Sequence, residues 1–266
     1  MTPLLNFVAI ADAHTQAGNL KHLPRLVDQI LALPDPPDFV VSLGDNIYGR
    51  PEQDTPADLR LYHRQIQRLP CPHAYVIGNH EAEPVELFRQ LGWEELLGIW
   101  GMPGRWYSFD CRGVHCVVVD SWIGLLQPDQ ADTLGRQVAW LRDDLARTEG
   151  PVLAFTHEAI GFEQADLPEW VETNNGWFWP TGNVLEQVLR DHADRLLGVF
   201  EGHKHKCLWK RRHGVPYHLI APAHQHEGQF AQVFLGTDGQ WRMQGHPDLG
   251  PADDHSRQVT YTSEPV

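Results

Sequence analysis

Gly78-Asn79-His80-Glu81 is the stretch that decides how this chain folds. It follows an apolar run at residues 73–77 that is typical of a short buried strand, so an amide and an imidazole stand on the loop leaving that strand. In α/β sheets, ligands bind outside the carboxyl ends of the strands. The stretch therefore predicts an α/β fold with a polar site at one edge of a sheet.

Four other predicted strands end in the same way. Asp12 and His14 follow residues 4–10, Asp45 follows residues 39–43, His157 follows residues 152–155, and His203 and His205 follow residues 196–200. Because such strand ends meet at one edge, we expect these side chains to converge with Asn79. Imidazole, carboxylate and amide ligands favour Mn, Fe or Zn over Ca. A carboxylate such as Asp45 can bridge, so the pattern predicts two divalent transition-metal ions about 3.5–4 Å apart.

The alternative explanation is chance, since the chain has 16 histidines and some must fall at strand ends. For any one residue, chance is a reasonable explanation. It is a poor explanation for five loops at once, each of which also carries Gly, Asn or Asp.

Composition limits the possible partners. The 266 residues include 35 acidic and 21 basic side chains, and the formal net charge of −14 repels polyanions. Extended nucleic acid and anionic membranes are therefore disfavoured. The single basic cluster, residues 208–212, would point its charges to both faces of a strand. No signal-peptide pattern or membrane-length apolar run is present, so the cytoplasm is the expected location.

The remaining pattern predicts a single domain over residues 1–246 and a poorly ordered tail over 247–266. Apolar spacing predicts helices over residues 20–31, 55–69, 84–91 and 184–192 and another around 138–145, with a loop at 92–105. Strands at 106–109 and 114–119 should form an antiparallel hairpin, which makes the sheet mixed. Short strands at 209–211, 217–220, 230–235 and 241–244 suggest an antiparallel second sheet.

The four cysteines lack metal-type spacing, which favours reduced thiols. Cys111 and Cys116 flank the predicted hairpin turn and could pair in an oxidising compartment.

Taken together, the motifs resemble those of the calcineurin-like metallophosphoesterases. The matching motifs are Asp12-x-His14, Gly44-Asp45, Gly78-Asn79-His80-Glu81, His157 and Gly202-His203-x-His205. The resemblance implies a four-layer α/β/β/α sandwich of two mixed β-sheets flanked by helices. It also implies one metal ion on Asp12, His14, Asp45 and His205, and another on Asp45, Asn79, His157 and His203. His80 would then be a catalytic residue that binds neither ion.

One departure within this resemblance concerns Tyr48. The stretch from Gly44 to Tyr48 is similar to the purple acid phosphatases, whose tyrosine binds iron, but Asp12-x-His14 is not their first motif. We therefore expect His14 to take the position that Tyr48 would fill, with Tyr48 beside the site or merely packed.

The resemblance implies a dinuclear metal-dependent phosphoesterase that hydrolyses a small phosphate ester, diester or nucleotide by in-line attack of a metal-bridging hydroxide. Two narrower possibilities stay open, an ADP-ribose/CDP-alcohol-type nucleotide diphosphatase and a cyclic-nucleotide phosphodiesterase. A nuclease would need a basic groove. A non-enzymatic binding module on the same fold, like the family's retromer subunit, is disfavoured because the ligand set and His80 are complete.

Substrate contacts are expected from two further places. Residues 161–182 have no clear period, and their Trp177 and Trp179 either border the substrate or pack on the second sheet. His224 follows a predicted strand and either borders the pocket or is solvated.

Overall fold

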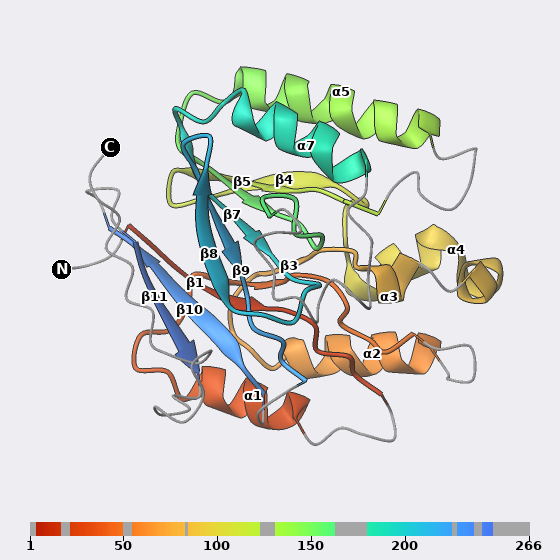
Figure 1. Ribbon diagram of the computed structural model, residues 1–266. Coiled ribbons are helices and arrows are strands. Elements are labelled where there is room, and N and C mark those ends of the chain that lie inside the picture. The colour runs from red at the N-terminus through yellow and green to blue at the C-terminus, as the bar shows by residue number, and fades with distance from the viewer. Residues whose placement is uncertain are drawn as a thin grey trace.

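Two mixed β-sheets form the centre of the molecule (Figure 1). The first contains β1 (Leu5–Ile10), β2 (Phe39–Ser42), β3 (His73–Tyr75), β10 (Phe230–Leu235) and β11 (Trp241–His246). The second contains β4 (Tyr107–Cys111), β5 (Val114–Val118), β6 (Val152–Phe155), β7 (Leu196–Glu201), β8 (Leu208–Arg212) and β9 (Val215–Leu219). Their strand orders are β11-β10-β1-β2-β3 and β4-β5-β6-β7-β9-β8. This computed structural model describes residues 4–16, 22–49, 55–82, 85–122, 131–162, 180–224, 228–236 and 241–246.

Helices cover the outer face of each sheet. They are α1 (Leu23–Leu31), α2 (Thr55–Ile66), α3 (Asn79–Ala82), α4 (Val85–Trp100), α5 (Ala131–Arg147) and α7 (Pro180–Arg190). Apolar side chains of α1, α2 and α4 pack on the first sheet, whereas those of α5 and α7 pack on the second (Figure 1). The four-layer α/β/β/α sandwich expected from the sequence is confirmed.

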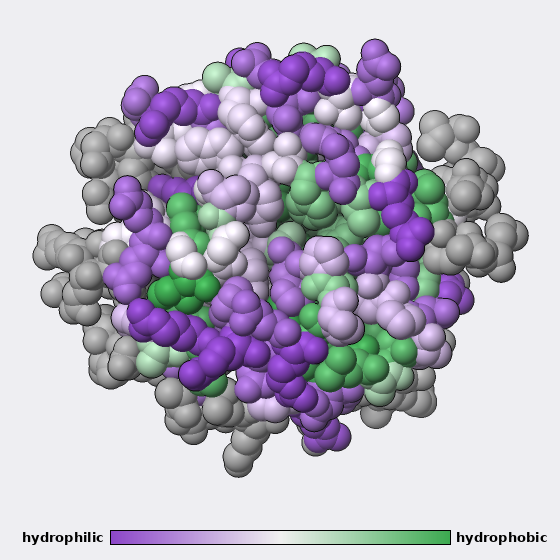
Figure 2. All heavy atoms as spheres, turned by 180° about the vertical axis from the view of Figure 1, so that it is seen from behind, coloured by the Kyte–Doolittle hydropathy of each residue, from purple (hydrophilic) through white to green (hydrophobic). Residues whose placement is uncertain are grey.

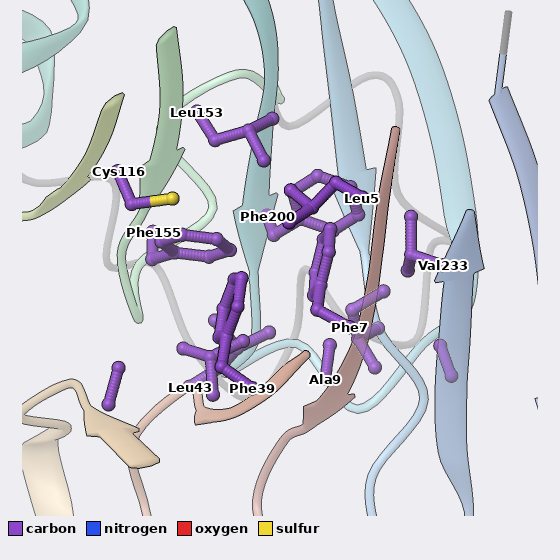
Figure 3. Close-up of a cluster of buried hydrophobic side chains, with 14 of the residues drawn as sticks. Leu5, Phe7, Ala9, Phe39, Leu43, Cys116, Leu153, Phe155, Phe200 and Val233 are labelled. Atoms are coloured by element: carbon purple, nitrogen blue, oxygen red, sulfur yellow. The ribbon is translucent and has the colours of Figure 1, made fainter. Parts of the chain in front are cut away.

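Aromatic side chains fill the space between the sheets (Figure 3). The Phe7 ring stacks on Phe39 at 5.1 Å between centroids, and it meets Phe155 and Phe200 edge-on at 5.6 and 5.0 Å. The neighbouring Val8 points the other way and packs with α1 and α2. Because β1 is covered on both faces, all of its residues are buried, which explains why all of them except Asn6 are apolar.

Parallel pairing brings the strand ends to one edge. In the first sheet β1, β2 and β3 are parallel, with Ile10 opposite Ser42 and Ser42 opposite Tyr75. In the second sheet β5, β6, β7 and β9 are parallel. The loops that follow β1, β2, β3, β6 and β7 can therefore meet at one site.

The expected loop over residues 92–105 is wrong in its first half. Helix α4 continues to Trp100 after a kink at Gly92, whose φ of 67° lies in the left-handed region. Leu96 and Trp100 are buried beside α2 because residues 93, 96, 97 and 100 have helical spacing. The abundance of Gly and Trp in this stretch concealed that spacing.

The expected antiparallel second sheet at the end of the chain is also wrong. The hairpin of β8 and β9 extends the second sheet, where β9 lies parallel to β7, and the hairpin of β10 and β11 extends the first sheet beside β1. Short-range pattern predicts a hairpin but not the sheet that it joins, because that choice depends on contacts distant in sequence. The tail over residues 247–266 lies outside the described residues.

All four cysteines lie in the described part of the chain and are free thiols. In the β4–β5 hairpin, Cys116 lies opposite Phe109 rather than opposite Cys111.

The face in Figure 2 is mainly hydrophilic, with hydrophobic residues in separate small areas. Within the described ranges, no helix has both the length and the apolar character needed to cross a bilayer.

Candidate metal centre

Seven side chains singled out in the sequence follow the strand ends described above. Asp12 and His14 follow β1, Asp45 follows β2, Asn79 begins α3 after β3, His157 follows β6, and His203 and His205 follow β7. Their donor atoms fall into two adjoining groups that share Asp45.

The first group combines two imidazoles with two carboxylates. His14 Nε2 lies 3.2 Å from His205 Nε2 and 3.9 Å from Asp45 Oδ2. His205 Nε2 lies 3.4 Å from Asp12 Oδ1. The donor atoms of these four residues all lie within 4.8 Å of one another, so they can hold one metal ion.

The second group lies on the other side of Asp45. His157 Nε2 is 3.2 Å from Asp45 Oδ1 and 3.0 Å from Asn79 Oδ1. His203 Nδ1 is 2.9 Å from the same amide oxygen. Asp45 thus turns Oδ1 toward this group and Oδ2 toward His14, which is the arrangement that a bridging carboxylate requires.

These donor atoms fit a cation better than they fit one another. The Asn79 amide oxygen faces both imidazoles and the Asp45 carboxylate, and only a reversed amide would donate hydrogen bonds to them. His157 Nδ1 donates to the Leu43 carbonyl oxygen at 2.8 Å, which leaves the lone pair of the neutral ring on Nε2. Several lone pairs therefore point at one place, as they do around a bound metal ion.

Burial and charge set the protonation states of the centre. Burial alone would raise the pKa of Asp45, but His157, His80 and His14 hold this pKa well below its usual range. Without a bound cation, burial opposes the charged form of His157, yet Asp45 raises its pKa to about 10, so a metal ion that binds Nε2 must displace a proton. Burial lowers the pKa of His14 to about 3, so its imidazole is neutral, which is the form that binds metals.

The backbone of the centre is strained. Five of the seven residues have a positive φ: Asp12 at 50°, His14 at 43°, Asp45 at 51°, His203 at 71° and His205 at 51°. A left-handed backbone is uncommon outside glycine and persists only where the surrounding structure enforces it. This concentration at one site supports a functional constraint on the positions of these side chains.

Glu81 holds the Asp45 loop in place, a role that sequence reasoning missed. Its carboxylate is fully buried and accepts hydrogen bonds from the backbone N–H groups of Gly78, Asp45, Asn46 and Ile47 at 2.8–3.2 Å. It thereby joins the loop after β2 to the loop after β3. The only signal in the sequence was an acidic residue next to His80.

Gly78 allows these two loops to approach closely. A Cβ atom at this position would lie 2.3 Å from both the backbone N and the Oδ1 of Asp45. We expect Gly78→Ala to lower the free energy of unfolding by about 1–3 kcal/mol, because overpacking must displace Asp45. Urea denaturation measures this loss, and metal analysis should show weaker binding. Gly135→Ala in α5 is the control, since it meets nothing within 4 Å and should leave stability equal or higher. A fully stable Gly78→Ala protein would contradict the close approach.

His80 lies beside both groups. Its backbone N–H donates to Asp45 Oδ1 at 2.8 Å and its ring Nδ1 donates to the Tyr48 carbonyl oxygen. Its Nε2 lies 3.8 Å from Asp45 Oδ2, and its side chain is 27% exposed. The Tyr48 ring stands 5.9 Å from the His14 ring, so Tyr48 borders the centre while His14 occupies it.

A cavity of about 310 Å³ opens at the first group, and its lining includes His14, Tyr48, His80, His205 and His224. The structure thus brings His224 to the site. Trp177 and Trp179, the other expected substrate contacts, lie outside the described residues.

Comparison with known proteins identifies the family. The family described as calcineurin-like phosphoesterase matches residues 5–207. The chain belongs to the calcineurin-like phosphoesterase family. This calcineurin-like phosphoesterase is 25% identical over 230 residues to a probable cyclic nucleotide phosphodiesterase from Synechococcus, covering 79% of this chain and 76% of that protein.

Solved structures share the calcineurin-like phosphoesterase fold with this chain. GAP50, the anchor in the inner membrane complex of Plasmodium, has a TM-score of 0.63 at 11% identity, covering 98% of this chain and 88% of that one. Phosphopantetheinyl hydrolase from Mycobacterium tuberculosis has a TM-score of 0.50 at 15% identity, covering 82% and 89%. At such identities the likeness shows a common fold.

A buried ion pair in this calcineurin-like phosphoesterase lies behind the second group. Glu158 Oε1 is 3.3 Å from Lys204 Nζ, and Glu158 Oε2 is 3.4 Å from His203 Nε2. Both charged residues are buried. This contact lacks hydrogen-bond geometry, but the nearby carboxylate favours a proton on His203 Nε2 by its charge, which leaves Nδ1 for the side of Asn79. Each of the two residues directly follows a candidate ligand in the sequence, but nothing there showed that they meet.

The contact between Glu158 and His203 leads to a prediction about metal binding. Glu158→Gln should weaken the binding of one metal ion about 10- to 100-fold, because the carboxylate that orients His203 is lost. Chelator competition measures the two affinities separately. Glu149→Gln, at an exposed position, should leave both affinities unchanged. Equal affinities in Glu158→Gln and wild type would show that Glu158 does not orient His203.

Proposed function

We propose that this chain is a dinuclear metal-dependent phosphohydrolase that acts on a small phosphate ester, diester or nucleotide. The observation that carries the proposal is Asp45, whose two carboxylate oxygens face two separate groups of potential metal ligands. Family membership supports the reaction class.

Each group would hold one ion of Mn, Fe or Zn, the metals that suit imidazole with carboxylate and amide oxygen. Asp12, His14, Asp45 and His205 would hold the first, and Asp45, Asn79, His157 and His203 the second. Such ions, when bound, supply Lewis-acid activation of phosphate and a hydroxide nucleophile near neutral pH. The chain fixes their positions through the buried loops that Glu81 ties together.

His80 would transfer a proton to the leaving oxygen. Its hydrogen bond to the Tyr48 carbonyl oxygen fixes the ring, so that Nε2 is the nitrogen available on the side of Asp45. A proton on Nε2 would pass to the departing oxygen as the bond to phosphorus breaks. His80 would thus act without being needed in either metal site.

Two observations bear on the substrate. The cavity of about 310 Å³ lies at the lower end of volumes for small-molecule sites, and the net charge of −14 opposes a polyanion. A cyclic nucleotide is the first specific candidate, because a relative 25% identical to this chain is named a probable cyclic nucleotide phosphodiesterase. An ADP-ribose/CDP-alcohol-type substrate is the alternative, which the resemblance of the sequence motifs left open.

A metal-by-substrate screen tests the proposal. Metal-free protein would be reloaded with Mn, Zn, Fe(II) or Mg and given phosphomonoesters, phosphodiesters, cyclic nucleotides and nucleotide diphosphates. We expect hydrolysis of at least one class with a transition metal and none after chelation. A protein that binds two ions but hydrolyses no class would instead support the binding-module alternative.

A further inference from the structure

His224 forms a third group of potential ligands with His14 and His205, outside the ligand set considered so far. One donor nitrogen from each of these imidazoles lies within 4.8 Å of those of the other two. The ring centroids are 4.6 Å apart for His14 and His224, and 4.7 Å apart for His205 and His224. His224 thus approaches both imidazoles of the first group.

The backbone fixes His224 in this position. Pro222 forms a parallel bridge with Ala11, and the backbone N–H groups of Ala223 and His224 donate to the carbonyl oxygens of Ala11 and Asp12 at 2.7 and 3.2 Å. The segment is therefore attached to the end of β1, the strand that also delivers Asp12 and His14. Little conformational freedom remains for His224 to lose when a ligand binds.

A side-chain hydrogen bond then orients the ring. His224 Nδ1 lies 2.8 Å from the Asp12 carbonyl oxygen, which can only accept, so Nδ1 carries the proton. In the neutral ring the lone pair is then on Nε2. Metal-binding histidines characteristically donate their other ring N–H to a carbonyl or carboxylate in this way.

We propose that His224 is an additional ligand, through Nε2, of the metal ion held by His14 and His205. The inference rests on the metal centre proposed above and gives His224 a different role from the substrate contact expected from the sequence. It would supply a further protein ligand beside His14 and His205, the two residues with which it forms a group. The two sites would then differ in affinity, and the site on the side of His14 would bind its ion more tightly.

Measurements of metal affinity, which need no substrate turnover, test this inference. His224→Ala removes the imidazole, whereas His224→Asn retains a side-chain N–H near the position of Nδ1 for the Asp12 carbonyl oxygen. We expect both variants to lose at least about tenfold in affinity for one ion and to keep the other, as measured by chelator competition. In the Co²⁺-loaded protein, the proton NMR spectrum of wild type should show one paramagnetically shifted imidazole N–H signal that the spectrum of His224→Asn lacks.

His22→Ala is the matched control, because His22 lines the same cavity but belongs to none of the three groups. It should retain both affinities and all shifted signals. Unchanged affinities and signals in both His224 variants, with a raised KM for substrate, would overturn the inference in favour of a substrate contact. A wild-type protein that binds no ion would instead overturn the metal centre itself, so the two failures are distinguishable.

Discussion

Asp45→Ala is expected to lose both metal ions and at least about 10³-fold in turnover, more than removal of a single charge-stabilising donor usually costs. Asp45 Oδ1 lies 3.2 Å from His157 Nε2, and Oδ2 lies 3.9 Å from His14 Nε2. Among the residues that the structure describes, Asp45 is the one that contributes to both groups. The substitution therefore removes a ligand from each site at once, and elemental analysis of reconstituted protein measures the loss.

The control for Asp45 is Asp132→Ala, which removes a carboxylate that is 88% exposed on α5. It should keep both ions and full turnover. Thermal unfolding followed by circular dichroism separates loss of metal from loss of fold. Reconstituted wild type with at most one ion, or Asp45→Ala with two, would rule out the bridging role.

His80→Ala should lose about 10²–10⁴-fold in turnover while it keeps both ions and near-native stability. The reason is that the His80 side chain belongs to neither metal group, whereas its Nε2 lies on the cavity side of Asp45. The loss should also depend on the leaving group. Nitrophenolate departs without a proton and an alkoxide does not, so nitrophenyl esters should be affected less than alkyl esters.

Rates on matched nitrophenyl and alkyl esters, together with metal content, decide the role of His80. The control is His213→Asn at an exposed turn position outside the cavity lining, which should leave the rates on both esters unchanged. Equal losses on both kinds of ester would mean that His80 stabilises charge on the phosphoryl oxygens rather than donating a proton. Loss of an ion from His80→Ala would make His80 a metal ligand.

Much of the centre could be predicted because its signals are local. Asp45 follows the buried strand β2 after two residues, and Asn79 follows β3 after three residues. Since parallel strands end at one edge, short-range pattern was enough to bring these side chains together. The seven candidate ligands do lie in two adjoining groups, and their roles as ligands stay a prediction.

Other features depend on contacts that no short-range pattern contains. Glu81 accepts a hydrogen bond from the N–H of Asn46, 35 residues away, and Glu158 meets Lys204 through a second loop. A charged side chain in a sequence does not reveal that it is buried, because solvated acids are far more common. The hairpin of β10 and β11 likewise carried no signal that it would lie beside β1.

The left-handed backbone at Asp12, His14, Asp45, His203 and His205 has a consequence for protein engineering. A left-handed conformation costs a non-glycine residue about 1–2 kcal/mol, whereas glycine adopts it freely. A campaign of random mutagenesis that selects only for heat resistance of the metal-free protein would thus enrich glycine at these five positions, because no bound ion then stabilises the native ligands. The most heat-resistant descendants would be the ones that can no longer assemble the centre, so any such library needs a simultaneous screen for metal content.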